Sequence, residues 1–163
     1  MLTTLLAAML TAASALATSP PVPSPQDVAR RDRLRQMLIA RDKAPPCTEL
    51  SSISDRLVED LQWLMDHVKT PPWVGVRAAQ CIIELHAPAE LSRIQGWMLD
   101  PTQPGLTLVV LGELDGLPAP IAIAIIQVAL TGPHAAKVAP RLLQSAHPQV
   151  RALLQRQAPG VPR

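Results

Sequence analysis

Residues that could carry out acid–base, nucleophilic or metal chemistry are few and far apart in this chain. Its four histidines have no carboxylate at a spacing that would force contact: His67, His86, His134 and His147. The nearest approach to a pair of metal ligands is Glu84-Leu85-His86. A later segment has Glu113-Leu114-Asp115 at the equivalent positions. The sequence contains no glycine-rich phosphate loop, no Gly-x-Ser-x-Gly and no His-Glu-x-x-His. It therefore predicts a protein that is not an enzyme and binds no cofactor.

The two cysteines fit a single disulfide if the chain is exported. Cys47 stands just before a predicted helix, and Cys81 lies inside another. Closing a loop of about 35 residues would restrain the unfolded chain by roughly 3.5 to 4 kcal/mol in the entropic model. The alternative is two free thiols in a reducing compartment, with Cys81 acting as a small apolar side chain. We favour the Cys47–Cys81 disulfide, and this preference depends on export.

A column of polar and aromatic residues follows one side of the helix expected after residues 52–55. That tetrad, Ser-Ile-Ser-Asp, resembles a capping box, so the helix should begin there and run to Lys69. Asp60 and His67 could form a metal site with a further carboxylate, but no second histidine stands four residues away and no Cys-x-x-Cys is near, so we expect no metal here. Trp63 lies outside the apolar stripe, so it either packs on the preceding helix or serves as an exposed anchor for a partner. We favour packing and keep Trp63 as a candidate for protein binding.

An arginine-rich helix should precede this column. Ser24 is suited to cap it, Pro25 to occupy its first position, and the helical pattern continues to about Lys43. A narrow apolar stripe runs along it: Val28, Leu34, Met37 and Leu38. The basic residues that we single out are Arg30, Arg31 and Arg35. The favoured interpretation is the solvated face of a capping helix, and the alternative is a basic surface for an anionic membrane or an acidic partner.

The N-terminal segment has the pattern of an export signal. Residues 2–17 carry no charge, are mostly apolar and end in Ala-Leu-Ala, which predicts a signal peptide over 1–17 with cleavage after Ala17. An uncleaved anchor or an ordinary buried helix is the alternative. Residues 18–25 then form a proline-rich linker, 26–158 the helical domain and 159–163 a flexible tail. The predicted location is periplasmic or secreted.

The centre of the chain repeats a short pattern. Pro72–His86 and Pro101–Asp115 align so that Ala79 and Ile82 fall on Leu108 and Leu111. In the first copy Val76 joins Ala79 and Ile82 on the apolar side, while Arg77 and Glu84 lie on a polar one. A second helix over 89–100 separates the copies, so the repeating unit is a helix pair.

Further helices should complete the core on the C-terminal side. Residues 118–130 are apolar almost all round and too short for a bilayer span, which predicts a buried helix at the centre of the core. Residues 135–146 should form a helix with its apolar side chains inward: Val138, Leu142 and Leu143. His147-Pro148 begins the last helix, which ends near Gln157.

The region from about residue 70 to 157 resembles HEAT-type repeats, or the related armadillo repeats. The resemblance rests on Pro72, Val76-Arg77, Ala79 and Leu85, and on the segment from His147 to Leu154. It implies an all-α, right-handed α-solenoid of about three helix pairs, preceded by one or two capping helices. Some HEAT-type proteins are metal-dependent enzymes, but Glu84-Leu85-His86 departs from their His-Glu pattern. The resemblance therefore implies a rigid surface that binds a protein partner.

Composition supports binding to protein rather than to nucleic acid. The chain has no Phe, no Tyr and three Trp, so it lacks the aromatic faces on which single-stranded bases stack. A net charge of +2 provides no strong basic field. The expected partner surface comprises Trp63, Arg77, Glu84 and Glu113. Peripheral membrane binding through the arginine-rich helix remains the alternative, with a metal-dependent enzyme less favoured.

Overall fold

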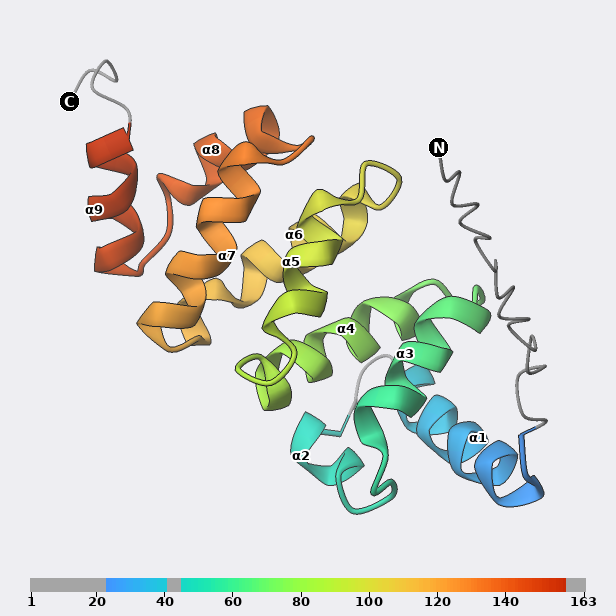
Figure 1. Ribbon diagram of the computed structural model, residues 1–163. Helices are drawn as coiled ribbons and strands as arrows, with labels where there is room; N and C mark the ends of the chain where they lie inside the picture. Colours follow the sequence, from blue (N-terminus) through green and yellow to red (C-terminus); the bar gives the residue numbers. More distant parts are fainter. Residues whose placement is uncertain (1–22, 41–44, 158–163) are drawn as a thin grey trace, which may run out of the picture.

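The structure, a computed structural model, describes residues 23–40 and 45–157, which form helices and connecting turns without a strand (Figure 1). The predicted all-α class is confirmed for these residues. The elements are α1 Pro25–Ile39, α2 Cys47–Leu50, α3 Leu57–His67, α4 Trp73–His86, α5 Leu91–Leu99, α6 Pro104–Glu113, the 3-10 turn η1 Leu114–Gly116, α7 Ala119–Thr131, α8 Ala135–Leu142 and α9 Pro148–Gln157. The predicted signal peptide, most of the linker and the C-terminal tail lie outside the described residues.

Helix α1 begins as its sequence predicts. The Ser24 hydroxyl accepts a hydrogen bond from the Asp27 amide at 3.1 Å, and the Asp27 carboxylate accepts one from the Ser24 amide at 3.1 Å. Each residue therefore satisfies an amide that the first helical turn leaves unpaired. The apolar stripe is narrower than predicted, because Leu34 and Leu38 are buried while Val28 is 49% exposed.

The predicted capping box before α3 is wrong. The helix starts at Leu57, and a short helix, α2, which the sequence did not predict, forms over Cys47–Leu50. Ser54 is buried, and its hydroxyl accepts a hydrogen bond from the Arg56 amide and donates one to the Asp60 carboxylate at 2.7 Å. The Ser54 hydroxyl thus stabilises the turn before α3 and the buried Asp60 carboxylate, and it does not cap the helix.

Helix α4 lies against α1, α2, α3 and α6. Ala79 and Ile82 are fully buried, as the apolar spacing predicts, and Ala78 and Ile83 are fully buried beside them. Val76 was assigned to the same side of the helix and is 41% exposed. Apolar residues at three- and four-residue spacing can cover a side of the helix wider than its neighbours bury. The helices that pack on α4 determine which of these residues are covered.

The register of the predicted repeat is also wrong. Leu108 aligns with the fully buried Ala79 but is 43% exposed, and Val110 is the fully buried residue of α6. A turn precedes α6, in which the Asp100 carboxylate accepts hydrogen bonds from the amide and hydroxyl of Thr102 at 2.8 and 2.7 Å. Because this turn delays the start of α6 to Pro104, a different set of side chains faces the core.

Helix α7 is the apolar helix predicted near the centre of the core. It buries Ala122, Ile125, Ile126 and Ala129. In the next helix Val138 and Leu142 are buried as predicted, but Leu143 is 51% exposed and was wrongly assigned inward. Leu143 still has helical backbone angles, and one residue after the buried Leu142 it points about 100° further around the helix axis, away from the core.

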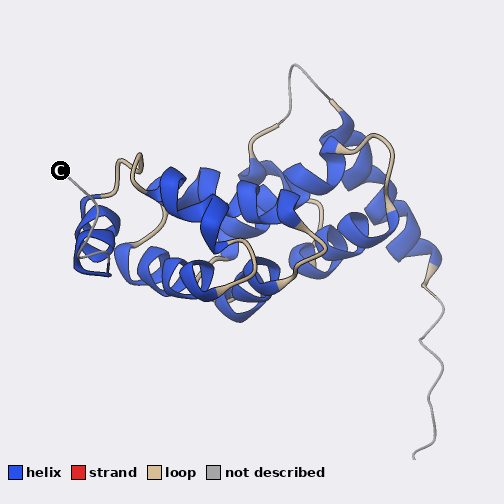
Figure 2. Ribbon diagram, turned by 90° about the horizontal axis from the view of Figure 1, so that it is seen from above, coloured by secondary structure: helices blue, strands red, loops and turns tan. Residues whose placement is uncertain are grey.

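The helices follow one another along the length of the molecule, from α1 at one end to α9 at the other (Figures 1 and 2). Figure 2 shows them in two layers. Helices next but one in the chain pack together: α4 on α6, α5 on α7, α6 on α8 and α7 on α9. Among the described helices, none combines the length and the apolar character needed to cross a bilayer.

Candidate functional site

A buried carboxylate joins α1 to α3. Asp60, in the first turn of α3, is fully buried and carries a negative charge that must be compensated there. Arg30 and Arg31 of α1 both donate to it, the Arg31 Nε at 2.8 Å from Oδ1 and the Arg30 Nε to Oδ2. Two of the three arginines singled out in the sequence therefore face a carboxylate inside the protein.

The pKa of Asp60 shows which of two opposing effects is larger. Burial disfavours the charged carboxylate and would raise the pKa, but hydrogen bonds from Arg30, Arg31 and Ser54 outweigh it and hold the pKa below its usual value. At α1 the half-buried Asp27 has its pKa lowered to about 2, first by the Ser24 hydroxyl and then by Arg30. The junction is therefore fully ionised at neutral pH.

Trp63 lies one turn beyond Asp60 on α3 and packs against α1. The Arg31 guanidinium carbon sits 4.8 Å from the centroid of the indole ring, a cation–π geometry. The His67 ring stacks on the same indole, with centroids 4.5 Å apart and planes 8° apart. Its Nδ1 lies 2.9 Å from the Trp63 carbonyl oxygen. The favoured prediction, that Trp63 packs on the N-terminal helix, is confirmed.

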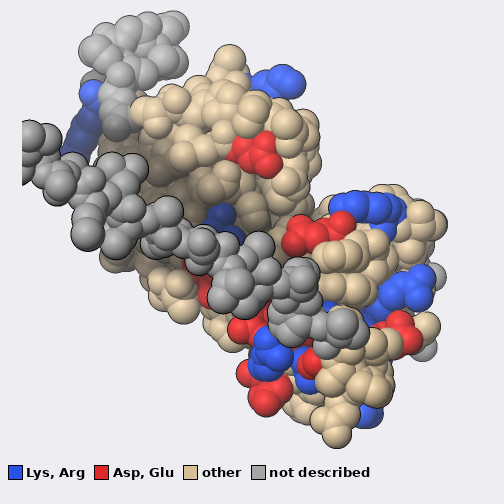
Figure 3. Space-filling view, turned by 45° about the vertical axis from the view of Figure 1, so that its right-hand side comes forward, with Lys and Arg blue, Asp and Glu red and all other residues tan. Residues whose placement is uncertain are grey.

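These residues line a surface hollow of about 450 Å³, which we name the Trp63 hollow. Its charged lining residues are Arg31, Arg35 and Lys69, against the single carboxylate of Asp32. Arg35 and Lys69 form no ion pair with the described residues. The space-filling view shows that charged atoms gather on part of the surface, beside a broad uncharged area (Figure 3). The Trp63 hollow is thus cationic with an aromatic wall.

A second, smaller hollow of about 220 Å³ contains the other predicted residues. Arg77, Glu84 and Glu113 line it together with Cys47 and Cys81, and we name it the Glu84 hollow. The two sulfurs lie 2.03 Å apart, so the predicted pairing is present at disulfide distance. The bridge links α2 to α4 and is compatible with an oxidising environment.

Three polar residues of the Glu84 hollow, Arg77, Gln80 and Glu113, have partners within the protein. Arg77 donates to the carbonyl oxygens of Leu38, at 3.2 Å, and of Ala40. Trp73 Nε1 donates to the Ile39 carbonyl oxygen at 3.2 Å. Both α4 side chains thus satisfy carbonyls that the end of α1 leaves unpaired. On the far side Gln80 donates to Glu113 at 3.0 Å, and Glu84 is exposed.

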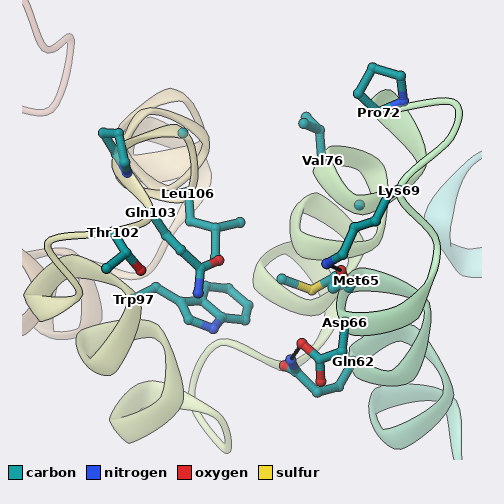
Figure 4. Close-up of a pocket in the computed structure, with 13 residues that line it drawn as sticks. Gln62, Met65, Asp66, Lys69, Pro72, Val76, Trp97, Thr102, Gln103 and Leu106 are labelled. Atoms are coloured by element: carbon teal, nitrogen blue, oxygen red, sulfur yellow. Dashed lines mark hydrogen bonds between the residues drawn. The ribbon is translucent and has the colours of Figure 1, made fainter.

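A third and larger hollow, of about 510 Å³, lies between α3–α4 and α5–α6 (Figure 4). Trp97 and Leu106 approach it from one side and Met65 and Val76 from the other, so we name it the Trp97 groove. The sequence did not reveal this groove, because the spacing of Val76 assigned it to the core, whereas the structure leaves it 41% exposed at the groove wall. Lys69 lines both the Trp97 groove and the Trp63 hollow.

The titratable residues considered for chemistry do not converge. His134 Nε2 lies 3.0 Å from the Asp100 carbonyl oxygen, while the buried His86 Nε2 and His147 Nδ1 have no hydrogen-bond partner among the described residues. Asp115 accepts hydrogen bonds from the Ser145 hydroxyl and the amides that precede α9, which lower its pKa. Within ranges 23–40 and 45–157, no three or more His, Cys, Asp or Glu side chains are grouped to hold a metal ion.

The fold sorts the predicted site residues into two places. Trp63, Arg31 and Arg35 line the Trp63 hollow. Arg30 does not line it and donates to the buried Asp60 carboxylate. Three others, Arg77, Glu84 and Glu113, meet beside the disulfide. Comparisons with protein-family models, curated proteins and solved structures give no match for this chain.

Proposed function

We propose that this chain is an exported HEAT-like repeat module that binds a protein partner and has no catalytic activity of its own. One observation carries the proposal: three residues singled out in the sequence, Arg31, Arg35 and Trp63, line one surface hollow. Arginine and tryptophan are enriched among the residues that dominate binding energy at protein interfaces. The hollow adjoins the larger Trp97 groove through Lys69, which extends the surface offered to a partner.

The packing order of the helices supports the repeat architecture. In an α-solenoid each helix pair packs on the next, so equivalent helices of successive pairs lie side by side. The contacts of α4 with α6 and of α5 with α7 have this relationship, and those of α6 with α8 and α7 with α9 continue it. We accordingly assign α3–α4, α5–α6 and α7–α8 as three HEAT-like pairs, with α1 as the capping helix.

Export is supported by two independent features. The N-terminal residues 1–17 have the pattern of a signal peptide, and Cys47 and Cys81 lie at disulfide distance. An intact mass that begins at Thr18, and that gains two alkyl groups only after reduction, would support both. A mass that begins at Met1 with two free thiols would contradict export.

The two alternatives have less support. A membrane-binding α1 would use Arg30, Arg31 and Arg35, but the first two bind Asp60. A metal-dependent enzyme would need ligands that converge, and Glu113 instead accepts a hydrogen bond from Gln80. Neither alternative explains why Trp63 lines the same hollow as the arginines.

Site-specific photo-cross-linking in the native host tests partner binding. A photoreactive amino acid would replace Asp32, which is exposed and lines the Trp63 hollow, or Gln127, which is exposed on α7. We expect one defined protein to cross-link from position 32 and not from position 127. The cross-link should weaken when Trp63→Ala is added. Equal labelling from both positions, or none from position 32, would contradict the proposal.

A further inference from the structure

We infer that the Trp63 hollow receives an acidic, extended segment of the protein partner, with its carboxylates on Arg35 and Lys69 and with Arg31 fixed beside them. The inference rests on the proposed function and names the chemistry of the partner at the same site. It follows from charge complementarity. Three cationic side chains and one carboxylate, Asp32, line the hollow.

The cations of the hollow differ in what already binds them. Arg31 shares its charge with buried Asp60 and is fixed in position by that bond. Arg35 forms no ion pair among the described residues, and Lys69 donates only to the Met65 carbonyl oxygen there, at 3.1 Å. Arg35 and Lys69 therefore keep most of their charge available for a ligand, while Arg31 supplies a rigid edge.

The aromatic wall is held in place before any ligand arrives. Trp63 is covered by the Arg31 guanidinium and stacked with His67, so binding would cost little side-chain entropy. Because Arg31 and His67 both lie on the indole, Trp63 acts by holding Arg31 at the wall of the hollow beside Arg35.

A peptide fits this hollow better than a membrane surface does. Peripheral helices that bind a bilayer insert a broad apolar face beside their basic residues. On α1 the large apolar side chain that is more than one-third exposed is Val28, while Leu34 and Leu38 are buried in the core. The cations also line a concave feature, which suits a chain more than a flat layer of headgroups.

The test uses the full-length protein and a labelled peptide in which Glu alternates with Ser. A peptide of about ten residues spans roughly 30 Å when extended. Binding would be followed by fluorescence anisotropy for the wild type and for the variant Arg35→Gln, Lys69→Gln. The matched control is Lys137→Gln, Arg141→Gln, which removes the same charge from exposed positions on α8. A Gln/Ser peptide and anionic phosphatidylglycerol vesicles complete the set.

We expect the acidic peptide to bind the wild type and the α8 control alike. Affinity should fall about tenfold in the Arg35, Lys69 variant, and binding should weaken as salt rises. Trp63→Phe should keep most of the affinity and Trp63→Ala should lose it. The Gln/Ser peptide should not bind.

Three results would overturn the inference. They are no binding of the acidic peptide, equal loss in both double variants, and vesicle binding that depends on Arg35 and Lys69 while peptide binding does not. If the peptide fails while the cross-link from position 32 persists, the proposed function stands and only the acidic chemistry is wrong. If the cross-link is lost but the peptide still binds, the hollow binds acidic chains and partner binding in the host is not supported.

Discussion

Two junctions of this molecule are held by different forces. Helix α1 buries Leu34 and Leu38, and it also joins α3 and α4 through charged and polar groups, with Arg30 and Arg31 on Asp60 and with Arg77 on the carbonyls that end α1. Helix α5 packs on α7, and both helices bury apolar side chains, including Ile94 and Met98 of α5 and Ile125 and Ile126 of α7. A polar contact between them is neutral: the Gln95 side-chain amide donates to the Ala124 carbonyl oxygen at 3.1 Å. No Lys or Arg occurs between Arg93 and Lys137.

The two junctions should differ in how they respond to pH, salt and the loss of a single side chain. An apolar junction tolerates changes of pH and salt, because burial of apolar area depends little on either. A junction built on a buried carboxylate depends on each charged group being present, since removal of one partner leaves the other unpaired. The Trp63 hollow lies at the charged junction, so its shape depends on the same bonds that hold α1.

The largest expected effect concerns the disulfide that stabilises the charged end. In the double variant Cys47→Ser, Cys81→Ser the free energy of unfolding should fall by roughly 3.5 to 4 kcal/mol, because the unfolded chain regains the entropy of the closed loop. Urea unfolding of the wild type with and without reductant measures the same loss. Reductant should leave the double variant unchanged. Coincident unfolding curves for oxidised and reduced wild type would contradict the bridge.

A cavity at the apolar junction should cost nearly as much. Ile125→Ala removes a fully buried side chain of α7 and should destabilise the protein by about 3 kcal/mol. Leu108→Ala, at a site that is 43% exposed, is the control and should cost less than about 1 kcal/mol. The cost of Ile125→Ala should not vary between low and high salt. A clear salt dependence would mean that charges also hold this junction.

At the charged junction, Asp60→Asn should destabilise the protein by about 3 kcal/mol, because Arg30 and Arg31 lose their shared counter-charge. Asp32→Asn removes an exposed carboxylate from α1 and should change the free energy of unfolding by less than about 0.5 kcal/mol. Urea unfolding at neutral pH measures both. Equal stability of the two variants would contradict this prediction. It would mean that the charge of Asp60 does not stabilise the junction.

The smallest effect should be a local one, caused by acid. Asp27, with a pKa of about 2, and Asp60 both titrate below the usual Asp value of about 3.9. The stability that they provide is therefore complete above about pH 4 and is lost as the pH falls through their folded-state pKa values. The backbone chemical shifts of α1 should lose helical character before those of α7 as the pH falls from 5 to about 2. Simultaneous loss in both helices would argue against a separate charged junction.

Local signals in the sequence were reliable where a few neighbouring residues decide the outcome. The cap at Ser24 and the all-helical class of the described residues were predicted from such signals. The capping box at residues 52–55 failed because the Ser54 hydroxyl binds Asp60, whose carboxylate is buried only once α1 covers it. The Trp97 groove could not be predicted either, since it depends on how two helix pairs are spaced.

By itself the sequence determined most of the segments that become helices, though not α2, which side of most of them is apolar, and which two cysteines can pair. Tertiary structure decided the rest. It left Val76 and Leu143 in solvent, it buried Asp60 beneath two arginines, and it placed Trp63 in the same hollow as Arg31 and Arg35. The physical reason is that helix formation depends on neighbours along the chain, whereas burial, charge pairing and surface shape depend on residues about 30 or more positions away.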